Sequence, residues 1–104
     1  MLVVMTTVGD AGEGESLARL IVEAKLAACV QILPKMTSVY FWEGKVQSQP
    51  EHMLLIKTLE EKLDELSEFI KKNHSYEVPE IVALSAGKVS EDYLKWMRDV
   101  IRES

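Results

Sequence analysis

The chain has 104 residues, of which 47% are hydrophobic and 28% are charged, and its formal net charge is −5. This length and composition predict one soluble domain, residues 1–104, with a single apolar core. The surplus of carboxylates argues against nucleic acid as a partner, because a phosphate backbone favours a basic surface. No apolar run approaches the roughly 20 residues of a membrane span, so we expect a cytoplasmic protein that does not bind membranes.

The first half of the chain predicts a strand, a helix and a long hairpin. Residues 2–7 are apolar and β-branched, which is typical of a buried strand. Apolar side chains at helical spacing predict an amphipathic helix over residues 13–28. Residues 29–46 predict one long strand that Pro34 interrupts, and residues 51–58 predict the returning strand. The polar residues 47–50, Gln-Ser-Gln-Pro, are the predicted turn.

The second half predicts a helix, a short strand and a last helix. Thr58 and Glu61 have the spacing of a capping box, which predicts that a helix begins there. A loop over residues 73–79 precedes a strand at 80–84, and Ser90 is the predicted cap of the last helix. The order β-α-β-β-α-β with one further helix predicts an α+β fold of the ferredoxin-like type, an antiparallel sheet with its helices on one face.

An aromatic run in the predicted hairpin indicates a second contact surface. Tyr40 and Trp42 share one face of an extended strand, while Val39 and Phe41 share the other. A small domain needs only one apolar face on its sheet. The second face therefore predicts either contact with another subunit or the wall of a binding crevice.

Two histidines and the single cysteine are the first candidates for binding chemistry. His74 lies in a predicted loop, and a lone histidine there is more often a hydrogen-bonded loop residue than a metal ligand. In a cyclic trimer, however, one ligand per chain becomes three, which keeps His74 as a candidate metal ligand. We expect His52 to be an ordinary surface residue. Cys29 lies among apolar residues with no basic neighbour in the sequence, which favours a packed thiol.

The junction of Lys57 and Thr58 is a candidate anion site, because free amides and a lysine would meet at a helix N-terminus. Alternatively, Thr58 only caps the helix and Lys57 is a solvated strand end. Tyr76 and Glu80 are possible polar partners elsewhere in the chain. The sequence lacks a G-x-S-x-G motif and the ending of a P-loop, so we expect no enzymatic activity.

Five separated segments carry a resemblance to one family. They are residues 25–30 (KLAACV), 38–45 (SVYFWEGK), 55–58 (LIKT), 74–81 (HSYEVPEI) and 93–96 (YLKW). Together, and in this order, they resemble the CutA divalent-cation tolerance family over nearly the whole chain. The resemblance implies a ferredoxin-like fold in a tight homotrimer, similar in architecture to the PII signalling proteins, in which long hairpins pair between subunits.

The resemblance also implies a role in tolerance of divalent metals, copper above all, without an established reaction. Family members proposed to bind copper have a cysteine late in the first strand and two adjacent histidines before a later loop. Here those positions hold Met5 and the pair Asn73-His74, so only His74 matches the pattern.

Two hypotheses follow. The first is a non-enzymatic homotrimer that binds copper or another divalent cation through His74 and nearby carboxylates. The second is a PII-like sensor that holds a small anionic molecule between subunits and signals to a protein partner. Its crevice would combine an anchoring charge with aromatic walls, which predicts six residues: Tyr40, Trp42, Lys57, Thr58, Tyr76 and Glu80.

Overall fold

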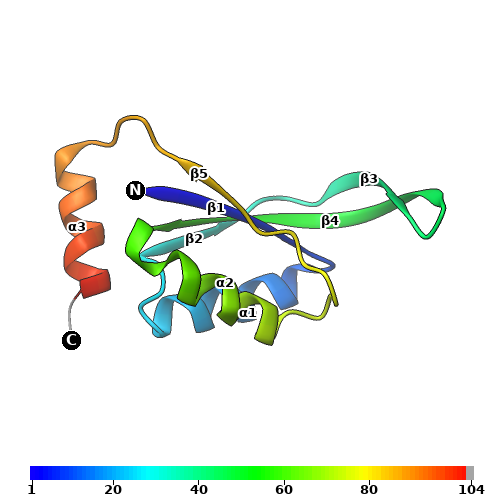
Figure 1. The fold of residues 1–104 in the computed structure, drawn as a ribbon, viewed down its shortest axis with the longest axis horizontal. Helices are drawn as coiled ribbons and strands as arrows, with labels where there is room; N and C mark the ends of the chain where they lie inside the picture. Colours follow the sequence, from blue (N-terminus) through cyan, green and yellow to red (C-terminus); the bar gives the residue numbers. More distant parts are fainter. Residues whose placement is uncertain (103–104) are drawn as a thin grey trace.

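One antiparallel sheet organises the fold in this computed structural model, which describes residues 1–102 (Figure 1). The predicted mixed α+β class with an antiparallel sheet is confirmed. The elements along the chain are β1 (Leu2–Val8), α1 (Ala11–Glu23), β2 (Cys29–Ile32), β3 (Met36–Trp42), β4 (Lys45–Thr58), the 3-10 turn η1 (Glu60–Lys62), α2 (Leu63–Asn73), β5 (Val82–Ser85) and α3 (Glu91–Arg102).

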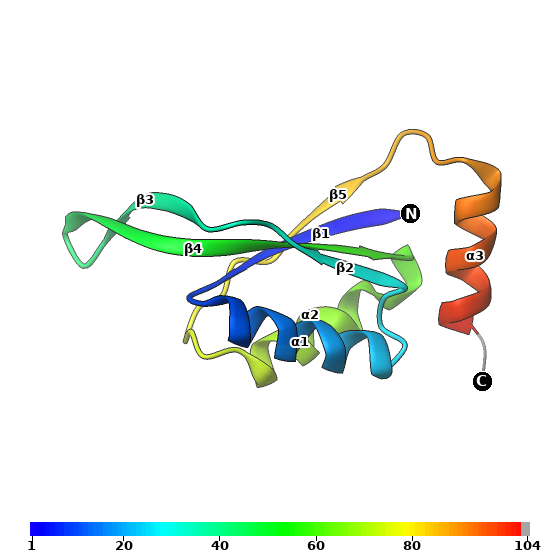
Figure 2. The same cartoon turned by 180° about the vertical axis from the view of Figure 1, so that it is seen from behind.

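Strand β4 belongs to two regions of the molecule. The strands of the sheet have the order β2-β4-β1-β5, and β3 pairs with β4 beyond this path. The second half of β4 lies between β1 and β2, whereas its first half pairs with β3 alone. We call β3 and residues 45–51 of β4 the arm, and the rest of the molecule the body. The arm projects from the body along the longest dimension, 45 Å (Figures 1 and 2).

The core lies between the sheet and the helices α1 and α2, which cover one of its faces (Figure 2). Side chains alternate along a strand, so β1 and β4 each send every second residue into this layer. Val4 and Ile56 are fully buried there, against Ile21 of α1 and Ile70 of α2. A second, smaller cluster lies under α3. The opposite face of the sheet carries partly exposed apolar residues: Val3, Met5, Met53 and Leu55.

The first helix starts and ends earlier than the predicted range 13–28. Asp10 caps it, because its Oδ1 accepts the backbone N–H of Glu13 at 2.7 Å. The helix ends at Glu23, and Lys25 has a positive φ of 60° that turns the chain away. The apolar residues that follow, 26–28, are buried in a connection and not in a helix. The predicted helix extends too far because residues 26–28 are apolar and buried, as helix residues would be, but lie outside the helix.

The predicted turn at residues 47–50 is wrong, because these residues lie within β4. The hairpin turns at Glu43 and Gly44, which both have positive φ, 50° and 80°. A two-residue turn with this backbone suits the twist of paired strands, and it places Trp42 opposite Lys45. The predicted break at Pro34 is present and separates β2 from β3, but the second part ends at Trp42 and not at residue 46.

The predicted capping box at Thr58 is also wrong. The Thr58 hydroxyl is fully buried and donates a hydrogen bond to the carbonyl oxygen of Leu26 at 2.7 Å. The short 3-10 turn that follows begins after Leu59 and has no side-chain cap. Thr58 thus ties β4 to the connection between α1 and β2.

Candidate functional site

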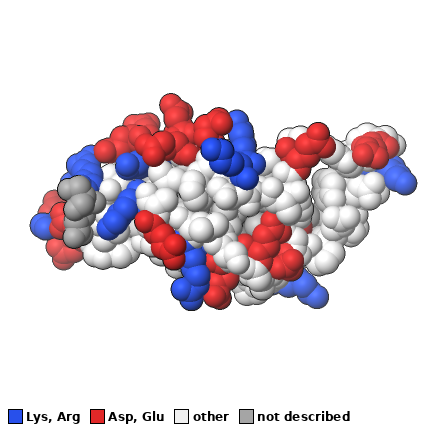
Figure 3. All heavy atoms as spheres, turned by 90° about the horizontal axis from the view of Figure 1, so that it is seen from below, with Lys and Arg blue, Asp and Glu red and all other residues white. Residues whose placement is uncertain are grey.

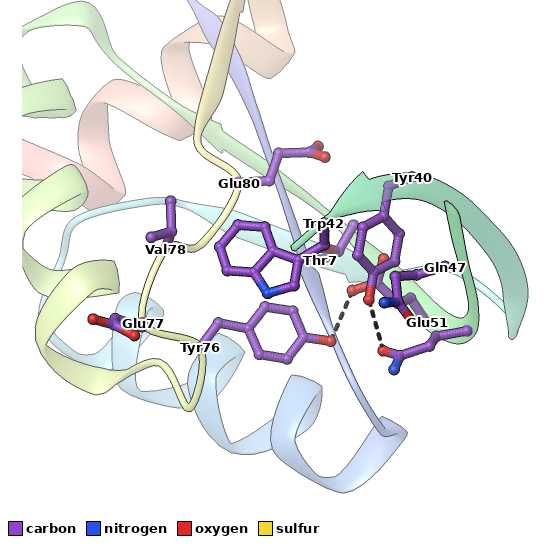
Figure 4. A pocket seen from close by; sticks show the side chains of 10 residues that line it. Thr7, Tyr40, Trp42, Gln47, Glu51, Tyr76, Glu77, Val78 and Glu80 are labelled. Atoms are coloured by element: carbon purple, nitrogen blue, oxygen red, sulfur yellow. Dashed lines mark hydrogen bonds between the residues drawn. The ribbon is translucent and has the colours of Figure 1, made fainter. Parts of the chain in front are cut away.

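A cavity of about 470 Å³ lies between the arm and the loop that connects α2 to β5 (Figure 4). Figure 4 shows aromatic and carboxylate side chains that enter it from both sides. The residues that line it are Thr7, Tyr40, Trp42, Gln47, Gln49, Glu51, Tyr76, Glu77, Val78 and Glu80.

The strand geometry of the arm separates its two faces. Tyr40 is paired with Gln47, and Trp42 lies two residues further along β3, so these three side chains share the face that lines the cavity. Phe41 is paired with Val46 on the opposite face, where their side chains are 70% and 69% exposed. The arm therefore presents a cavity wall on one face and an uncovered apolar surface on the other.

The carboxylate of Glu51 is the buried polar centre of the cavity. Glu51 is only 8% exposed, and its Oε2 accepts the hydroxyl hydrogen of Tyr76 at 2.7 Å. Burial of the phenol, followed by its hydrogen bond to Glu51, raises the pKa of Tyr76 above its usual value. The hydroxyl of Tyr40 donates to Oε1 of Gln49 at 3.0 Å. Both phenols are therefore held in place by hydrogen bonds that their hydroxyls donate.

The electrostatics of the cavity are acidic. Three of the residues that line it are glutamates, namely Glu51, Glu77 and Glu80, and none of the described residues that line it is lysine or arginine. Glu77 and Glu80 are exposed. In Figure 3, acidic and basic side chains are interspersed over the body, whereas most of the arm is uncharged. The cavity thus favours a cation over an anion.

His74 tethers the loop beside this cavity. Its Nε2 lies 2.7 Å from the carbonyl oxygen of Thr7, so this nitrogen donates, and its Nδ1 accepts the backbone N–H of Tyr76 at 3.0 Å. The side chain is fully buried. In this conformation neither ring nitrogen offers a lone pair, and binding of a metal by His74 would require one of these hydrogen bonds to break.

The other positions of the family's copper pattern have structural roles here. Met5 is a partly buried residue of β1, paired with Leu55 and Val82. The side-chain amide of Asn73 donates to the carbonyl oxygen of Phe69 at 2.9 Å. Within residues 1–102, no three His, Cys, Asp or Glu side chains come together as a metal site. The ligands of this single chain therefore do not form a metal centre by themselves.

Within one chain, Lys57 and Thr58 do not line this cavity. They lie six and seven residues beyond Glu51 on β4, which is about 20 Å along an extended strand. Lys57 instead places its Nζ 5.7 Å from the centre of the Tyr93 ring, under α3. The structure brings four of the six predicted residues together at the cavity: Tyr40, Trp42, Tyr76 and Glu80.

Sequence reasoning missed the polar residues that β4 contributes. Gln47, Gln49 and Glu51 are spaced by two residues, so they share one face of the strand and line the cavity together. This spacing was a usable signal, but the predicted turn at 47–50 removed the strand that carries it. With the turn at Glu43-Gly44, the same alternation places all three beside Tyr40.

Two further residues have different surroundings from those expected. His52 is part-buried and its Nδ1 lies 2.9 Å from the carbonyl oxygen of Leu33, so it fastens the break between β2 and β3 and is no ordinary surface residue. Cys29 is half-buried, and its partner across the strands is Lys57. Strand pairing thus makes a basic residue the cross-strand neighbour of Cys29, which its neighbours in the sequence do not indicate.

Comparison with known proteins decides the family. Residues 2–100 match the family described as "CutA1 divalent ion tolerance protein". The chain belongs to the CutA1 family. It is 48% identical over 103 residues to "Protein CutA 1, chloroplastic" of Oryza sativa subsp. japonica, covering 99% of this chain but 58% of that protein. The chain thus spans little more than half of this longer relative.

Two other comparisons cover both chains almost completely. The chain is 42% identical over 97 residues to "Divalent-cation tolerance protein CutA" of Thermus thermophilus, covering 93% of this chain and 94% of that protein. The crystal structure of CutA1 from Oryza sativa superposes with a TM-score of 0.94 at 48% identity, covering 99% of this chain and 94% of that chain. Within residues 1–102, no helix is both long and apolar enough to cross a membrane.

Proposed function

We propose that this protein acts in divalent-cation tolerance as a non-enzymatic, cytoplasmic homotrimer of ferredoxin-like protomers that binds copper or another divalent cation. Membership of the CutA1 family supports the tolerance role, because the family description and the name of the Thermus relative both state it. The sheet order β2-β4-β1-β5, with α1 and α2 on one face, supports the ferredoxin-like assignment.

The acidic cavity is the observation that carries the cation-binding part of this proposal. Glu51, Glu77 and Glu80 line it together with two glutamine amides. Carboxylate and amide oxygens are the donors that hard and borderline divalent cations accept. The net charge of −5 adds a general attraction for cations. The same charge makes nucleic acid and anionic membranes poor partners.

The uncovered surfaces support the trimer. Val39, Phe41 and Val46 are about two-thirds exposed on the outer face of the arm, and Val82 and Leu84 are exposed on β5 at the edge of the sheet. Apolar patches of this kind mark contact surfaces between proteins. In a trimer each carboxylate occurs three times, so a second subunit can supply the ligands that one chain lacks.

The sensor hypothesis has less support. Its anionic ligand depended on Lys57 and Thr58, which the structure places at the far end of β4. The described residues around the cavity include no basic side chain that could replace them. An anion would therefore meet three carboxylates without a compensating charge.

Calorimetric titration of the metal-free protein with Cu(II) and Zn(II) tests the cation site. The double variant Glu77→Gln with Glu80→Gln removes two charges and keeps the side-chain size, and we expect affinity to fall at least tenfold. Glu60→Gln is the matched control, because Glu60 is exposed beyond the opposite end of β4. Absence of saturable binding in the wild type, or equal affinity in the double variant, would contradict the proposed site.

A further inference from the structure

We propose that the cavity between the arm and the 76–80 loop binds a small organic ammonium ion against Tyr40, Trp42 and Tyr76. This ligand is a different chemical class from the metal ions of the proposed function, and the proposal does not depend on metal binding. Both kinds of cation use the carboxylates, but only the organic ion needs the aromatic walls.

The aromatic walls come from two separate elements that face one another. Tyr40 and Trp42 are two residues apart on β3, so both lie on its cavity face, and Tyr76 enters from the loop after α2. Figure 4 shows the rings of Tyr40, Trp42 and Tyr76 among the side chains that line the cavity. The face of an aromatic ring attracts a cation within about 6 Å, and quaternary ammonium ions are commonly held by several rings.

Hydrogen bonds fix two of the rings before any ligand arrives. The Tyr76 hydroxyl donates a hydrogen bond to the carboxylate of Glu51, and the Tyr40 hydroxyl donates one to the side-chain amide oxygen of Gln49. Because both hydroxyl hydrogens are already donated within the protein, the two rings are held in place at the cavity wall. A wall that is already ordered costs little conformational entropy when the ligand binds.

The charge of the cavity selects the sign of the ligand. Glu51, Glu77 and Glu80 are among the residues that line the cavity, and no lysine or arginine is among the described residues of the lining. Lys45 is paired with Trp42 on the same face of the arm, next to the turn, but it does not line the cavity. An organic anion would therefore be repelled, whereas a cation finds both carboxylates and ring faces.

Within one chain, the cavity suits an alkylated nitrogen better than a metal ion, which would need further ligands from a second subunit. A metal ion needs several converging donor atoms to replace its water ligands, and no such group of three forms within residues 1–102. An alkylammonium ion has a diffuse charge and apolar methyl groups, which contact aromatic walls and need no coordination geometry. The volume of about 470 Å³ is within the range of small-molecule sites.

The test is a titration of the native oligomer with tetramethylammonium chloride, followed by calorimetry and by the fluorescence of its tryptophans. The control ligand is tert-butanol, an uncharged molecule of similar size. We expect saturable binding of tetramethylammonium and at least tenfold weaker binding of tert-butanol. Equal affinity for the two would show a merely apolar cavity and overturn the proposal.

Tryptophan variants separate the two cation classes. We expect Trp42→Leu to weaken tetramethylammonium binding about tenfold and Trp42→Phe to retain most of the affinity. Trp96→Leu is the control, because Trp96 on α3 is similarly exposed, 45% against 49% for Trp42, but lies outside the cavity. Unchanged tetramethylammonium binding in Trp42→Leu would overturn the proposal.

Zn(II) titration of the same variants keeps the two proposals distinguishable. Trp42→Leu should leave the Zn(II) affinity unchanged, because the ring contributes no metal donor atom. Glu80→Gln should weaken both ligands, since its carboxylate is common to both. Loss of metal binding alone would therefore count against the proposed function and not against the aromatic site.

Discussion

The two halves of β4 show how one strand can have opposite surroundings. In the body, Leu54 and Ile56 are fully buried between the sheet and the helices. In the arm, Val46 on the same strand is 69% exposed, because no helix covers that region. Alternation determines which side chains share a face, but a second layer determines whether that face is buried. In the body, the helices of the same chain cover the sheet, whereas the arm can be covered only by a ligand or by another subunit.

The largest effect on stability should come from the body. Ile56→Ala removes a fully buried side chain from the core and leaves a cavity, so we expect the free energy of unfolding to fall by about 2–5 kcal/mol. Urea unfolding followed by circular dichroism measures this. A loss below about 1 kcal/mol would mean that the body is less tightly packed than its burial indicates.

The contact that joins the arm to the body should have an intermediate effect. Tyr76→Phe removes the hydrogen bond to the buried carboxylate of Glu51, so we expect a loss of about 1–3 kcal/mol. Tyr40→Phe is the matched control, because its partner Gln49 is exposed, and it should cost less. Equal losses of unfolding free energy in the two variants would show that the hydrogen bond to buried Glu51 stabilises the protein no more than the exposed one to Gln49.

The same contact should make stability depend on pH. Because the pKa of Tyr76 is raised in the folded state, the folded protein holds the phenolic proton more tightly than the unfolded chain does. This contribution is complete below the unfolded pKa of about 10 and is lost as the pH rises through the folded value. Between pH 8 and 11, the free energy of unfolding should fall more steeply with rising pH for the wild type than for Tyr76→Phe. Parallel curves would contradict the assigned cause.

The smallest effect on stability should come from the N-terminal cap of α1. Asp10→Ala removes the side-chain acceptor for the N–H of Glu13 at the start of α1, and we expect a loss of about 1 kcal/mol. Asp10→Asn should restore most of it, since its amide oxygen can accept the same bond. Thermal unfolding of the three proteins provides the comparison.

Features that depend on local periodicity could be predicted from the sequence. Tyr40 and Trp42 were expected on one face of a strand and do line the cavity together, because alternation is a property of adjacent residues. The turn was misplaced for a physical reason. Residues 48–50 are exposed in one chain, so a polar sequence there is compatible with a strand as well as with a turn.

Contacts between distant residues could not be predicted in this way. The partner of Glu51 is 25 residues away in the chain, and the carbonyl that His74 contacts is 67 residues away. Nothing near either residue in the sequence indicates these bonds. The chemistry of Lys57 and Thr58 suggests an anion site, but within one chain the length of β4 separates them from the cavity.

The mass of the protein in solution tests the account of the arm most directly. Multi-angle light scattering should give three times the chain mass of 11.8 kDa for the wild type. Phe41→Glu places a charge on the outer face of the arm, where the side chain is 70% exposed, and it should reduce the mass to one chain while the body stays folded. A wild-type mass of one chain, or a Phe41→Glu variant that remains trimeric, would contradict the assignment of this face to subunit contact.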